Sequence, residues 1–150
     1  MSDAAAQPDY QLDHVCLAVR KIAPARAMLE KTLGYSARTE PVTNTRQQVN
    51  VQFMRKAGSI DIKLIEPSSL TSPLVDFIKE RGGGLHHLAF KTQNVADGVQ
   101  DLQAKGARVL TPPQPGEAFD EADIAFAFLG AGLNVELIDT DRRRLEKEPD

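Results

Sequence analysis

An internal repeat constrains the fold of this 150-residue chain more than any other feature. His14 lies in the segment LDHVCLAV, and His87 lies in the related segment LHHLAFK at an offset of 87 − 14 = 73 positions. The same offset places Lys63, within SIDIKLIE, onto Glu136, within GLNVELID. Similarity at a fixed offset indicates one structural module used twice. We therefore expect the function to lie between the two copies.

The first copy predicts a βαβββ module. Residues 12–19 alternate between apolar side chains and a second set that contains His14 and Cys16, which is the period of a strand. Pro24 suits the first turn of a helix that Gly34 ends, and this helix is expected to pack on the apolar face of the strand. Further strands are expected at residues 37–42, 48–54 and 60–66.

A short helix is expected to connect the copies, because Ser72 can cap its start and Pro73 suits its first turn. Glycines at 82–84 would end it. In the second copy Asn94 is the expected N-cap of a helix that stops at Gly106. Its strands are expected at residues 85–91, 107–110, 123–128 and 133–138. The predicted class is α+β, with two tandem βαβββ modules that form a cleft.

The chain divides by sequence into five segments. They are a flexible lead-in (1–10), the first module (11–69), a helical connector (70–84), the second module (85–140) and a tail (141–150). Residues 111–119 contain three prolines and predict a long loop, while residues 142–150 predict a solvated end.

Composition limits the classes of partner. A net charge of −3 and a pI near 5.6 argue against nucleic acid and anionic membranes. The chain has no membrane-length apolar run and no secretory signal at its start, which favours the cytoplasm. Its one cysteine, Cys16, excludes an internal disulfide and is expected to be a small packing residue.

Four polar residues are the candidate site. His14 and His87 share a repeat position, and Lys63 and Glu136 share another in strands that are otherwise apolar. Buried charges are costly unless they pair, bind a metal or face a cavity. Two histidines and a carboxylate suit a divalent metal, whereas a structural ion pair between Lys63 and Glu136 is the alternative. His86 is expected to point away and to be structural.

The duplicated modules, the opening LDHV and the stretch SPLVDFI leading to GGLHHLAF resemble the vicinal oxygen chelate superfamily, within it most nearly methylmalonyl-CoA epimerase. The resemblance covers nearly all of residues 11–140 and is most specific over 72–90. It implies a glyoxalase-like fold, a small-molecule substrate and a homodimer. It also implies a divalent metal (Co, Ni, Mn or Zn) held by four side chains. Their positions here are His14, 63, His87 and Glu136.

Two departures from that family bear on the chemistry. Lys63 replaces a glutamate or glutamine, and a protonated lysine offers no lone pair to a metal, so the metal is expected either with Lys63 displaced or not at all. The epimerases' additional base is a carboxylate, where this chain offers Asn50 and Gln52. These two residues and Lys91 are the candidate substrate contacts.

Three functions remain open at this stage. In the first, His14, His87 and Glu136 hold a metal while Glu136 moves a proton next to a carbonyl or thioester, as in an isomerase, epimerase or lyase. In the second, Lys63 replaces the metal and Glu136 acts as base on the opposite face of the substrate. The third is a metal-free, non-catalytic binding or resistance protein of the same fold.

Overall fold

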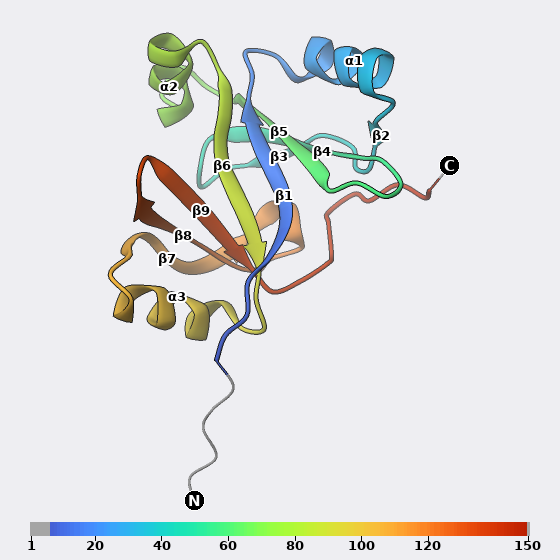
Figure 1. Cartoon of the computed structure of the whole chain (residues 1–150). Helices are drawn as coiled ribbons and strands as arrows, with labels where there is room; N and C mark the ends of the chain where they lie inside the picture. The colour runs from blue at the N-terminus through green and yellow to red at the C-terminus, as the bar shows by residue number, and fades with distance from the viewer. Residues whose placement is uncertain (1–6, 150) are drawn as a thin grey trace, which may run out of the picture.

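The computed structural model describes residues 7–149, in which nine strands form one sheet and three α-helices pack against it (Figure 1). The first half contains β1 (Gln11–Ala18), α1 (Ile22–Leu33), β2 (Ser36–Ala37), β3 (Val42–Asn44), β4 (Val49–Arg55) and β5 (Asp61–Pro67). The connector is α2 (Pro73–Arg81). The second half contains β6 (Gly84–Lys91), α3 (Val95–Ala104), β7 (Arg108–Gly116), a 3-10 turn η1 (Glu117–Phe119), β8 (Ala122–Gly130) and β9 (Leu133–Ile138).

Strand order repeats between the halves. The sheet runs β2-β4-β5-β1-β6-β9-β8-β7, with β3 paired to β4. β1 pairs with β5 in parallel and β6 pairs with β9 in parallel, while β1 and β6 join the halves as an antiparallel pair at the centre (Figure 1). The predicted α+β duplication is confirmed. The first and last strands of each module are therefore the four central strands.

The two sides of the sheet have different roles. On one side α1 covers β5 through Ile22, Leu29 and Leu64, and α3 covers the second half through Val95 and Leu137. The other side holds a core shared by both halves. Its buried members include Cys16, Phe53, Ile65, Phe119 and Ile138. Side chains that point into this shared core can meet across the repeat.

Local signals placed the helices correctly. The Ser72 hydroxyl accepts a hydrogen bond from the Leu74 amide, and the Asn94 side chain accepts one from the Asp97 amide, as capping requires. Gly34 ends α1 in the left-handed region at φ 74°. Among the described residues no helix is long and apolar enough to cross a membrane.

Two strand predictions were wrong. The strand expected at residues 37–42 is split into β2 and β3, which pair with different parts of β4. The loop expected at residues 111–119 is largely strand, because β7 continues to Gly116 beside β8. Prolines are tolerated there since β7 is the edge strand, and its pairing is irregular around Thr111.

The tail predicted as a solvated end at residues 142–150 is exposed at Arg142 and at residues 144–149, but Arg143 is buried. Arg143 is only 3% exposed and its guanidinium lies 4.6 Å from the Phe53 ring centre and 4.8 Å from that of Phe119. Figure 1 shows the chain after β9 running along the first half of the molecule. There Glu146 and Thr39 form an isolated antiparallel β-bridge between their backbones. Part of the expected flexible lead-in, residues 1–6, lies outside the described residues.

Candidate active site

Three side chains from three of the central strands converge on a carboxylate oxygen that the fourth strand supplies. Oε1 of Glu136 on β9 lies 3.0 Å from Nζ of Lys63 on β5, 3.2 Å from Nε2 of His87 on β6 and 3.4 Å from Nε2 of His14 on β1. The parallel pairs β1–β5 and β6–β9 place a last strand beside each first strand, and the β1–β6 pair brings the two halves together. The convergence expected from the repeat is therefore present.

The pair of Lys63 and Glu136 is buried. Lys63 is 4% exposed and Glu136 is fully enclosed. Burial alone would raise the pKa of Glu136, but the charge of Lys63 and the hydrogen bond from His87 hold that pKa well below its usual range. Glu136 is thus an anion in the folded protein. The Lys63 ammonium also lies 5.5 Å from the ring centre of Phe119.

A β-bulge precedes each histidine of this cluster. Register shifts in the β1–β6 pairing leave Asp13 as the extra residue before His14 and His86 as the extra residue before His87. Asp13 Oδ2 lies 2.7 Å from Nδ1 of His14, and His86 Nδ1 lies 2.8 Å from Nδ1 of His87. The bulged residue therefore orients the neighbouring imidazole in both copies.

These contacts assign the protons. Although burial tends to raise the pKa of Asp13, hydrogen bonding from His14 and the charge of Arg143 keep it lower than usual. An ionised Asp13 only accepts, so Nδ1 of His14 donates to it. His87 donates from Nε2 to Glu136, which leaves its Nδ1 to accept a hydrogen from His86. Burial lowers the pKa of His87 to about 4, so it is neutral near pH 7.

The prediction that His86 points away from the site was wrong. The bulge turns it to the same side as His87, and strand alternation alone could not have indicated this. Its ring also packs edge-on against Phe77 of α2, with 4.8 Å between ring centres. Burial lowers the pKa of His86 to about 4.

A cavity of about 310 Å³ opens beside the cluster. Lys63, His86 and His87 line it from the central strands, and Asn134 lines it from β9. Other polar walls are Arg46, Gln47 and Thr111, and the apolar walls are Val49, Ile65, Pro73, Leu74, Leu110 and Phe126. Glu136 and His14 lie behind this lining. A ligand in the cavity therefore meets the Lys63 ammonium and the paired imidazoles first.

The structure places the predicted substrate contacts outside the cavity. Because Val49, Val51 and Phe53 face the shared core, Asn50 and Gln52 point to the other side of β4. Asn50 bonds to Thr43 and Glu66, and Gln52 donates to the Thr39 carbonyl. Lys91 forms an ion pair with Asp141 and does not line the cavity.

Lys63 and Glu136 were also expected on opposite faces of a substrate. Their charged atoms are 3.0 Å apart, which leaves no space for a substrate carbon between them. The two groups act as one unit from the same wall.

The cluster offers three donor atoms of the type and spacing that a divalent ion uses. Ligand atoms around one ion lie roughly 3.0–3.5 Å apart, and Nε2 of His14 and Oε2 of Glu136 are buried without a hydrogen-bond partner. The net charge of the cluster, however, does not suit a divalent ion. The one carboxylate of the cluster is already neutralised by Lys63, and a divalent ion at its Oε1 would lie next to the ammonium. While Lys63 is charged, this set does not suit a divalent metal.

Comparison with known proteins gives the family. The model of the Glyoxalase/Bleomycin resistance protein/Dioxygenase superfamily matches residues 13–126. The uncharacterized protein YqjC of Bacillus subtilis is 37% identical over 100 residues, 67% of this chain and 70% of that protein. The mitochondrial methylmalonyl-CoA epimerase of Bos taurus is 33% identical over 102 residues, 67% of this chain but only 57% of the bovine protein.

Solved structures agree with this assignment. A variant of Streptomyces coelicolor methylmalonyl-CoA epimerase in complex with 2-nitronate-propionyl-CoA superposes with a TM-score of 0.77 at 25% identity. The superposition covers 87% of this chain and 96% of that one. The chain therefore belongs to the glyoxalase, bleomycin resistance protein and dioxygenase superfamily.

Proposed function

We propose that this chain is an epimerase-type enzyme that removes and returns a proton on a carbon next to a carbonyl or thioester group. The observation that carries the proposal is the Lys63 ammonium, which lines the cavity beside His87 while buried Glu136 holds it from behind. Proton removal at such a carbon moves the C–H electron pair onto the carbonyl oxygen as an enolate. A fixed positive charge in a water-poor wall stabilises that oxygen.

Lys63 supplies this charge from the protein itself. Its contact with Glu136 fixes the ammonium before substrate arrives, so little reorganisation is needed when charge develops on the oxygen. No step of this mechanism uses a divalent ion, because Lys63 already provides the cation of the site.

His87 is the proposed proton carrier. It lines the cavity, it is neutral near pH 7, and its Nε2 hydrogen is held by Glu136. Glu136 can stabilise the imidazolium that forms when Nδ1 takes a proton, as a buried carboxylate does behind a catalytic histidine. For Nδ1 to do so, the hydrogen bond from His86 must open, and His86 sits at the cavity where a substrate can displace it.

The proposed substrate class is the CoA thioester of a branched dicarboxylic acid, such as methylmalonyl-CoA. Named relatives are methylmalonyl-CoA epimerases, and the Streptomyces protein is bound to 2-nitronate-propionyl-CoA. A cavity of about 310 Å³ is large enough for the acyl end of such a molecule. Arg46 at its wall can meet an acid group.

The test is exchange of the α-proton in deuterium oxide. Methylmalonyl-CoA incubated with the protein should gain one deuterium, followed by mass spectrometry. Lys63→Met should reduce the exchange rate by at least 100-fold, because the enolate charge is then unopposed. The double variant Lys63→Met/Glu136→Gln tests whether a lost exchange rate only reflects unfolding. It leaves no uncompensated buried charge, and removing a buried pair as a unit is tolerated better than breaking it.

Lys91→Met is the matched control, because it removes a lysine outside the cavity and should leave the rate unchanged. Full exchange in Lys63→Met protein would contradict the proposed role of Lys63. Saturable binding of the thioester without exchange would instead identify a non-catalytic binding protein.

A further inference from the structure

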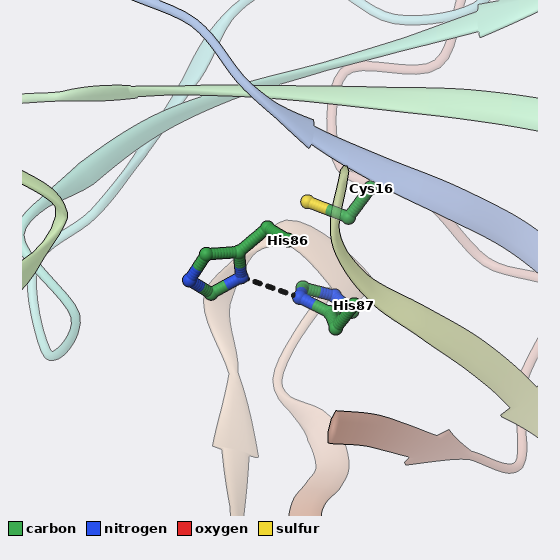
Figure 2. A group of neighbouring side chains, drawn as sticks. All are labelled: Cys16, His86 and His87. Atoms are coloured by element: carbon green, nitrogen blue, oxygen red, sulfur yellow. Dashed lines mark hydrogen bonds between the residues drawn. The ribbon is translucent and has the colours of Figure 1, made fainter. Parts of the chain in front are cut away.

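We propose that Cys16, His86 and His87 form a binding site for a thiophilic cation such as Zn²⁺ or Cu⁺. One ligand atom from each of the three side chains lies within 4.8 Å of the others. Figure 2 shows the Cys16 sulfur on β1 directed toward the side on which the two imidazole rings of β6 lie. The site is separate from the donor set of His14 and Glu136, although it shares the His87 ring.

The bulge in β6 creates this grouping. Cys16 is the register partner of His87 across the β1–β6 pair, so its sulfur lies on the same side of the sheet as that imidazole. The extra residue His86 is turned to the same side, and its Nδ1 is 2.8 Å from that of His87. A regular strand would place His86 on the opposite face, with only two ligands left.

The ligand types select the cation. Thiolate and imidazole together favour zinc and monovalent copper over magnesium or calcium. Ligand atoms around tetrahedral zinc lie roughly 3.3–3.8 Å apart. Side-chain rotations that move the three ligand atoms by about 1 Å are therefore enough to enclose the ion. Because His86 and His87 line the cavity, a water molecule or a ligand from the cavity can complete the fourth position.

The two donor sets differ in the negative charge that they offer to a cation. The charge of Glu136 is already neutralised by Lys63. The Cys16 thiol, in contrast, can release its proton when a cation binds and so supply a new negative charge. Burial keeps this thiol protonated until a cation binds, so it is not a free nucleophile. A bound cation would lie against the cavity wall and engage His87 at Nδ1, which would block its use in proton transfer.

Cobalt titration tests the site without any assay of activity. Co²⁺ bound by a cysteine gives a thiolate-to-cobalt charge-transfer absorption in the near ultraviolet. Purified protein, reduced and free of tags, should show this band with a stoichiometry near one per chain, and Zn²⁺ should abolish it. Cys16→Ser and Cys16→Ala should both lack the band, and His86→Gln should weaken Co²⁺ binding at least 10-fold.

His14→Gln is the control that separates the two donor sets. It removes a ligand of the other set and should leave the charge-transfer band in place. The proposal is overturned if the wild-type chain gives no thiolate band at millimolar Co²⁺, or if the band persists with unchanged affinity in His86→Gln. Since no substrate is involved, either result leaves the proposed epimerase function untouched.

Discussion

Lys63 and Glu136 form a buried ion pair with 3.0 Å between their charged atoms. Removing one partner of a buried pair costs roughly 3–5 kcal/mol, because the remaining charge is left uncompensated. The same pair explains why a set of residues arranged like metal ligands does not suit a divalent ion. Both consequences can be measured on single substitutions.

Lys63→Gln should convert the cluster into a divalent metal site. The substitution frees Glu136 and adds an amide oxygen beside His14 and His87, so we expect affinity for Ni²⁺ or Co²⁺ to rise at least 10-fold over wild type by calorimetry. Without metal the variant should be less stable by roughly 3 kcal/mol, and metal should restore that loss. Adding His14→Ala should remove the gained affinity. Unchanged affinity in Lys63→Gln would mean that the lysine is not what opposes the metal.

The histidine pair predicts an acid-sensitive fold. The pKa of His86 and of His87 is lowered to about 4 in the folded protein, so the unfolded chain binds more protons between pH 4 and about 6.5. Stability should therefore fall as pH decreases through that window, by up to about 1.4 kcal/mol per pH unit for each histidine. Urea unfolding of His86→Gln should show a smaller slope over the same window. If the wild type and His86→Gln showed the same dependence of stability on pH, the lowered pKa assigned to His86 would be contradicted.

At the scale of elements, the turn between α2 and β6 fixes where β6 begins. Gly83 has φ 99°, and a Cβ there would lie 2.7 Å from the Ala18 carbonyl oxygen at the end of β1. Gly84 has nearly the same φ of 97° but open space around the position of its Cβ. The turn thus brings two backbones into contact at the central strand pair.

Gly83→Ala should destabilise the protein more than Gly84→Ala. Both substitutions force an alanine into the left-handed region, at roughly 1–2 kcal/mol, but only Gly83→Ala adds a clash with backbone. We expect a further loss of about 2 kcal/mol in the free energy of unfolding, measured by urea denaturation. Equal losses in the two variants would show that the close approach to Ala18 has no energetic weight.

Sequence could predict most elements and part of the site, for identifiable reasons. The repeat offset placed His14, Lys63, His87 and Glu136 together because each strand position is equivalent in the two copies. The bulge at His86 could not be predicted, since it depends on the register between β1 and β6. Asn50 and Gln52 were assigned to the cavity because the epimerases that the chain resembles carry an additional carboxylate on this strand, whereas the face of β4 toward the cavity is apolar.

At the scale of the whole molecule, the end of the chain stabilises the beginning. Arg143 lies 2.7 Å from Asp13, which orients His14. Arg144 donates its amide hydrogen to the Ala118 carbonyl, and Arg38 pairs with Glu146. The segment after β9 therefore closes the shared core across both halves.

Arg143→Met should lower the free energy of unfolding by roughly 2 kcal/mol, because Asp13 loses its guanidinium partner and keeps only His14, while the packing on Phe53 is largely kept. Arg142→Met, at the exposed neighbour, is the control and should change little. Thermal and urea unfolding would measure both. Equal stability of the two variants would mean that the buried guanidinium contributes no net energy.

In the proposed mechanism, the protein's own lysine replaces a metal in an epimerase-type site. The most direct test of this mechanism is the rate of α-proton exchange in methylmalonyl-CoA before and after exhaustive treatment with a chelator. The mechanism predicts the same rate in both samples, with no increase on adding Co²⁺, Ni²⁺ or Mn²⁺. Exchange that disappears with the chelator and returns with one of these ions would contradict it.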